Sequence, residues 1–90
     1  MELIKKIRVD NELGIHARSA AKIVELAAKY ESGIFFRKDG KEVDGSSILS
    51  ILTLACPKGT EIEIRISGED SKKLMEKMTE LFVNKFGEKK

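Results

Sequence analysis

The only histidine of the chain, His16, stands in the run Gly14-Ile15-His16-Ala17-Arg18. A neutral imidazole is a nucleophile near neutral pH. Arg18, two residues further on, brings a planar guanidinium whose paired N–H groups suit phosphate oxygens. A helix predicted to begin at Ala17 would add free N–H groups and the positive end of its dipole. The spacing therefore predicts an anion site, for phosphate in particular, with a nucleophile inside it.

Taken by itself, a histidine at a junction between a loop and a helix also suits a capping or packing role. An enzyme built around His16 would need a second catalytic group close by. Beyond Arg18, the sequence indicates no base and no oxyanion-binding set of residues. We therefore expect no enzyme active site.

The composition is that of one globular domain covering residues 1–90, with 41% apolar and 36% charged residues. The net charge of only +2 gives no reason to expect nucleic acid or a membrane surface as a partner. The single cysteine, Cys56, fits a reducing compartment, and no signal peptide or membrane span is recognisable. We expect a monomer located in the cytoplasm and without a cofactor. We also expect no metal site, because no His or Cys partners stand at metal-ligand spacing.

The elements that must position His16 can be read from the apolar spacing in the first half of the chain. Residues 2–9 have strand character, and residues 17–30 carry apolar side chains at helical spacing. Residues 34–37 and 41–43 are predicted to form a hairpin, with Asp-Gly in the turn at 38–40.

The second half begins with capping hydroxyls at 45–47, which predict a short helix from residue 48 to about 54. Residues 60–67 alternate strictly between isoleucine and charged or polar side chains, as a half-buried strand does. A last helix is predicted to start near Glu69 and Asp70, acids suited to a first turn. Its buried residues are expected to be Leu74, Met78, Leu81, Phe82 and Phe86, with a frayed tail at 88–90. The order β-α-β-β-α-β-α, with one polar sheet face, predicts an α+β fold of two layers.

These residues resemble a known family, the histidine-containing phosphocarrier protein HPr of the phosphoenolpyruvate-dependent sugar phosphotransferase system. The likeness rests on residues 14–18, on Ser47-Ile48-Leu49 and on residues 58–62, and it extends over essentially the whole chain. It implies an open-faced β-sandwich, in which a four-stranded antiparallel sheet carries three helices on one face. It also implies a carrier that takes a phosphoryl group from enzyme I and passes it to enzyme II components for sugar uptake. Such a carrier is a reactant of phosphotransferase enzymes and not itself an enzyme.

The resemblance assigns roles to residues around His16. His16 would accept the phosphoryl group on Nδ1, and the helix start at Ala17, Arg18 and Ser19 would bind the phosphate. The helix terminus stabilises such a group by about 0.3–2 kcal/mol. Ser19 stands where the family usually has proline, and its hydroxyl suits either a bond to the phosphate or a cap.

The short helix carries the remaining candidates. By resemblance, Ser47 is a regulatory site for a serine kinase and phosphorylase, while its plain alternative is an N-cap hydroxyl. The helix is apolar around most of its circumference, which predicts an exposed apolar patch. By resemblance, Ile48, Leu49 and Leu52, with the basic Lys22 nearby, would dock enzyme I and enzyme II partners. Full burial of this helix under a loop is the alternative to a patch.

The sequence also suggests two alternative functions. A regulatory HPr paralogue, in a nitrogen-related branch or acting as a corepressor, would use the same histidine relay. An RNA-binding domain of similar order would stack bases on aromatics of its exposed sheet face, but the first and last predicted strands have none.

Overall fold

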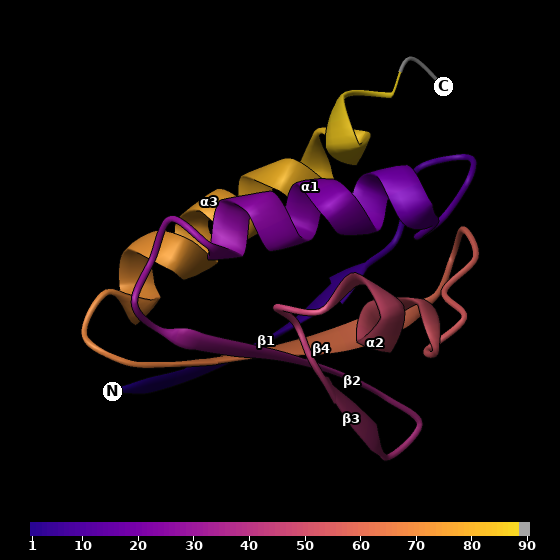
Figure 1. Cartoon of the computed structure of the whole chain (residues 1–90). Helices are drawn as coiled ribbons and strands as arrows, with labels where there is room; N and C mark the ends of the chain where they lie inside the picture. Colours follow the sequence, from indigo (N-terminus) through magenta and orange to yellow (C-terminus); the bar gives the residue numbers. More distant parts are fainter. Residues whose placement is uncertain (89–90) are drawn as a thin grey trace.

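The computed structural model describes residues 1–88 and confirms the predicted order of elements (Figure 1). The elements are β1 (Glu2–Arg8), α1 (Ala17–Ala27), β2 (Gly33–Lys38), β3 (Lys41–Asp44), α2 (Ile48–Leu52), β4 (Glu61–Ser67), α3 (Ser71–Val83) and a short 3-10 turn η1 (Lys85–Gly87). The strands form one antiparallel sheet in the order β1-β4-β2-β3. The predicted α+β sandwich of two layers is therefore confirmed.

The alternation predicted for β4 appears in its burial. Ile62, Ile64 and Ile66 are buried on the face covered by helices, and Arg65 lies on the opposite face. There its guanidinium carbon lies 4.4 Å from the ring centroid of Phe35, a cation–π contact that shields this aromatic side chain.

The core lies between the sheet and two antiparallel helices, α1 and α3, which run side by side across it (Figure 1). Phe82 of α3 contacts Phe36 of β2, with ring centroids 6.2 Å apart. The short α2 packs against α1 and β3. This arrangement places the N-terminus of α1 above the loop that leaves α2.

Helix α1 ends at Ala27 and not at Tyr30 as predicted. The N–H groups of Lys29 and Tyr30 bond to carbonyls only three residues back, those of Leu26 and Ala27. This tighter turn replaces the last helical residues ahead of Gly33.

Helix α3 begins at Ser71, directly after the predicted start near Glu69 and Asp70, but the Asp70 side chain makes no capping hydrogen bond to it. Its carboxylate accepts bonds from the backbone N–H groups of Glu31 (2.8 Å) and Ser32 (2.9 Å), and from the Ser32 hydroxyl. These bonds, led by the one from the Ser32 hydroxyl, lower the pKa of Asp70. Asp70 ties the loop after α1 to the start of α3.

The end of the chain departs most from expectation. Helix α3 stops at Val83, and Phe86 is buried not in a helix but in η1, with a φ of +57°. Its ring meets Phe82 edge-on at 4.8 Å between centroids. Glu88, predicted to fray, is held in place by side-chain contacts, while residues 89–90 lie outside the described part of the chain.

Candidate functional site

The loop that carries His16 is anchored on both of its sides. Asn11, which is fully buried, donates from Nδ2 to the carbonyl of Gly14 at 2.7 Å. The N–H of Ile15 donates to the carbonyl of Cys56 at 2.8 Å. Gly14 has a φ of +66°, and a Cβ added to it would lie 2.5 Å from that same carbonyl. Glycine is therefore required here both for the backbone angle and for the close approach.

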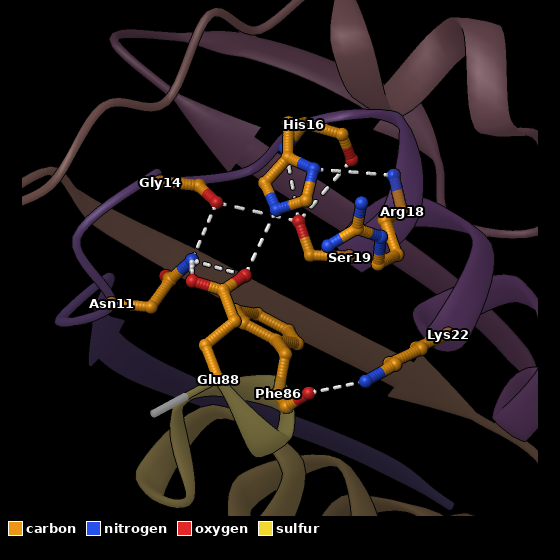
Figure 2. A network of polar contacts seen from close by, with 8 residues as sticks. All are labelled: Asn11, Gly14, His16, Arg18, Ser19, Lys22, Phe86 and Glu88. Carbon is orange, nitrogen blue, oxygen red and sulfur yellow. Dashed lines mark hydrogen bonds and ion pairs between the residues drawn. The ribbon is translucent and has the colours of Figure 1, made fainter. Parts of the chain in front are cut away.

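His16 itself is the N-cap of α1. Its backbone is extended, and Nδ1 accepts a hydrogen bond from the N–H of Arg18 at 3.2 Å. In return, the N–H of His16 donates to Oγ of Ser19 at 2.9 Å, so side chains cap the helix reciprocally (Figure 2). The capping alternative is thus realised, and it puts the imidazole at the positive end of the helix.

The other ring nitrogen of His16 meets the far end of the chain. Nε2 lies 2.8 Å from Oε2 of Glu88, although the two residues are 72 positions apart. The two side chains are 27% and 14% exposed, respectively. Asn11 donates from Nδ2 to both oxygens of Glu88, at 3.0 and 3.1 Å. Figure 2 shows the carboxylate facing the imidazole from the turn after Phe86.

Glu88 is the residue beside His16 that the sequence does not indicate, because residues 88–90 were predicted to be a frayed tail and no second group was expected near His16. Burial works to raise the pKa of the Glu88 carboxyl, but the hydrogen bonds from His16 and Asn11 outweigh it and lower the pKa overall. The carboxylate is therefore ionised at neutral pH and can only accept hydrogen bonds.

These contacts assign the tautomer of a neutral imidazole. Because Glu88 can only accept, Nε2 carries the proton, and because Nδ1 accepts from the N–H of Arg18, its lone pair is free of a proton. The ring thus presents a nucleophilic Nδ1 toward the first turn of the helix.

The three residues of the first turn of α1 differ in their exposure and contacts. Ala17 and Arg18 are exposed, and the Arg18 guanidinium makes no hydrogen bond or ion pair within residues 1–88. Ser19 is 1% exposed, and its hydroxyl contacts the carbonyls of His16 (3.2 Å) and Gly14 (3.3 Å). Of the two alternatives for Ser19, the cap is the one that its contacts support.

Lys22, predicted as a docking residue, donates from Nζ to the carbonyl of Phe86 at 2.5 Å. This bond joins α1 to the turn that bears Glu88 (Figure 2). Lys22 therefore contributes to the placement of that turn.

Helix α2 carries both predicted features. Oγ of Ser47 accepts from the N–H of Ser50 at 3.2 Å, so Ser47 is the N-cap. Leu49 is 77% exposed and Ile48 36%, whereas Ile51 is buried and Leu52 half-buried. The helix is not covered by a loop, and its outer side presents apolar surface.

Within residues 1–88, no three His, Cys, Asp or Glu side chains gather closely enough to hold a metal ion. In the same range no helix is long and apolar enough to span a membrane. Cys56 is a free buried thiol, and burial raises its pKa.

Comparison with known proteins gives a consistent result. A family model described as the phosphorylation site of the PTS HPr component matches residues 3–84. The phosphocarrier protein HPr of Xylella fastidiosa is 41% identical over 83 residues, which are 92% of this chain and 93% of that protein. The HPr-like protein Crh of Bacillus subtilis is 38% identical and is matched over 82% of this chain and 87% of its own. The crystal structure of HPr-C-His from Thermoanaerobacter tengcongensis superposes with a TM-score of 0.93 at 33% identity, covering 98% of this chain and 99% of that one.

Proposed function

The chain belongs to the HPr family of phosphocarrier proteins of the phosphotransferase system, and on this basis we propose that His16 relays a phosphoryl group from enzyme I to enzyme II components. The observation that carries the proposal is the hydrogen-bonded state of the imidazole. Its Nδ1 lone pair stands at the N-terminus of α1, and its other nitrogen is already occupied by Glu88.

The transfer follows from this geometry. The Nδ1 lone pair attacks the phosphorus of phosphorylated enzyme I, an N–P bond forms, and the bond between phosphorus and the donor breaks. The N–H of Arg18 exchanges its bond to Nδ1 for one to a phosphoryl oxygen. The Arg18 guanidinium neutralises the remaining oxygens. Helix terminus and guanidinium stabilise the group modestly, which suits a group that must leave again.

The protein is a reactant in this scheme and not a catalyst. Each cycle consumes the free imidazole in the first transfer and restores it in the second. Because this chain contributes only the imidazole and a few groups around it, the partner enzymes supply the rest of each transition state. We place the relay in the cytoplasm, where phosphoenolpyruvate is made and where a single free thiol such as Cys56 stays reduced.

We assign partner docking to the exposed side of α2, formed by Ile48 and Leu49 with the half-buried Leu52. The loop that follows α2 is bonded to the His16 loop through Cys56 and Ile15. A partner seated on α2 therefore also faces His16. Exposed apolar side chains grouped in this way are typical of an interaction surface.

Ser47 is the residue that we assign to regulation by a serine kinase. The neighbouring Ser46 donates its hydroxyl to Oδ1 of Asp44 at 2.7 Å, so a phosphate there would face a carboxylate. Ser47 accepts from a backbone N–H instead, and a phosphate on it would keep that acceptor role. The roughly two negative charges of a phosphate on Ser47 would lie beside Ile48 and Leu49 and would oppose the approach of an acidic partner.

The relay is tested by incubating the protein with phosphoenolpyruvate and its cognate enzyme I, followed by intact mass measurement and phosphorus NMR. We expect one acid-labile phosphate on a histidine, and none on His16→Ala. Addition of enzyme II components should then remove it. A labelled His16 that no enzyme II discharges would favour the regulatory paralogue. Absence of any phosphate would contradict the proposed function.

A further inference from the structure

We propose that Glu88 is a positioning residue for phosphoryl transfer: it orients His16 through Nε2 and stabilises the positive charge that the ring acquires when Nδ1 is phosphorylated. This inference rests on the proposed function of His16. Its structural basis is the 2.8 Å contact between Nε2 and Oε2.

Glu88 is held in this position by more than its contact with His16. Asn11 donates to both of its carboxylate oxygens, and the same amide group donates to the carbonyl of Gly14 in the His16 loop. The Phe86 ring, 2% exposed, anchors the turn in the core. Lys22 fastens the Phe86 carbonyl to α1. The carboxylate is thus brought to the imidazole by a turn that is fixed at three other points.

The charge balance of the transfer explains what a carboxylate does there. Before the attack the ring is neutral, with its proton on Nε2. When the Nδ1 lone pair forms the N–P bond, the ring keeps that proton and becomes a phosphorylated imidazolium. The new positive charge appears 2.8 Å from the anionic oxygen of Glu88. In the reverse direction the protonated ring is the better leaving group, so the same contact serves both transfers.

The arrangement is similar to the acid–histidine pair of a serine hydrolase. There a buried carboxylate fixes the tautomer and stabilises the imidazolium, and its replacement by an amide costs about 10⁴-fold in rate. Glu88 is partly exposed, and water weakens its field, so we expect a smaller effect of about tenfold. Such a loss is well within the range of a kinetic measurement.

A purely structural role is the competing explanation, because Glu88 also ties the end of the chain to the loop. Glu88→Gln distinguishes the structural role from the proposed role in transfer, because glutamine keeps the size and an acceptor oxygen for Nε2–H but lacks the negative charge. Glu88→Ala removes both. Glu76→Gln is the matched control, because Glu76 is an exposed residue of α3 and the change in net charge is identical.

The test has two measurements on the same variants. The first is the rate of His16 phosphorylation by cognate enzyme I and of its discharge to enzyme II. We expect Glu88→Gln and Glu88→Ala to slow both about tenfold or more, with unchanged affinity for enzyme I and with Glu76→Gln at the wild-type rate. Wild-type rates in both Glu88 variants would overturn the proposal.

The second measurement is proton–nitrogen correlation NMR of isotope-labelled histidine, in which the single His16 gives one set of signals. The wild type should show a slowly exchanging Nε2–H, which is lost in Glu88→Ala. If the wild type shows no protected Nε2–H, the proposal fails even if the relay works. If the wild type shows the signal but takes no phosphate, the function proposed for His16 has failed instead.

Discussion

The backbone N–H of Ile15 donates to the carbonyl of Cys56 at 2.8 Å, which joins the loop bearing His16 to the loop that leaves α2. Nothing but hydrogen fits between Gly14 and that carbonyl. The His16 imidazole and the exposed apolar side of α2 are therefore placed relative to each other by one short contact between two loops.

Gly14→Ala tests this contact. The new Cβ would lie 2.5 Å from the Cys56 carbonyl at a φ of +66°, so the loops must separate. We expect a loss of about 1–3 kcal/mol in unfolding free energy and slower phosphorylation of His16. Gly40→Ala is the control, because Gly40 has a φ of +82° but open space around its Cα. Equal losses from the two variants in denaturant titrations would show that the close approach is unimportant.

Arg18→Ala should slow phosphoryl transfer and leave the fold intact. The exposed guanidinium has no partner within residues 1–88, and in the proposed transfer it neutralises the phosphate. We expect a rate about tenfold lower, which corresponds to roughly 1.4 kcal/mol, in rapid-quench transfer from enzyme I. The comparison is Arg37→Ala, a change of equal charge at an exposed position of strand β2. If both variants transfer at the wild-type rate, Arg18 has no part in the mechanism.

Leu49→Glu should weaken enzyme I binding without loss of stability. Leu49 is 77% exposed on α2, so a charge there is solvated in the free protein but desolvated under a partner. Calorimetric titration should give a dissociation constant at least about tenfold higher. Val83→Glu, at a 67% exposed position at the end of α3, should bind as the wild type does. An unaltered affinity for Leu49→Glu would place the docking surface elsewhere.

Asp70→Asn should lower the melting temperature in a pH-dependent way. Hydrogen bonds from Ser32 and Glu31 lower the pKa of Asp70 from its usual 3.8, so the carboxylate stabilises the fold at any pH above that value. The contribution disappears as the pH falls through the lower folded pKa. The gap between wild type and variant in thermal melts should be full near neutral pH and close in strong acid, whereas Asp10→Asn should show no such gap. A gap that is constant with pH would contradict the assignment.

The elements of regular spacing were predictable because their signals are local. The isoleucine alternation of β4, the Asp-Gly turn between β2 and β3, and the start of α1 all depend on neighbours within a few residues. The C-terminal ends of α1 and α3 could not be predicted in this way, because tertiary contacts decide them. After α1, for example, the carboxylate of Asp70 accepts from the amides at 31 and 32, and no pattern near residue 70 signals this.

The residues of the site also differ in how far the local sequence could predict them. His16 and Arg18 are recognisable from one short segment, and the structure places both at the helix start. Glu88 follows a glycine near two lysines, in a stretch whose composition is that of a solvated tail. Its place beside His16 depends on the burial of Phe86, which bends the chain back through a positive φ that a phenylalanine seldom adopts. Only tertiary packing creates that contact.

The separation of 72 residues between His16 and Glu88 also fixes an order in time. At about 5–20 residues per second, the ribosome completes the acceptor histidine roughly 4–14 seconds before it adds the glutamate. A nascent chain therefore exposes the imidazole before it acquires the carboxylate, which reaches His16 once the turn around Phe86 has closed on the core. In biosynthetic terms, the histidine has its final environment only after residue 88 has been added.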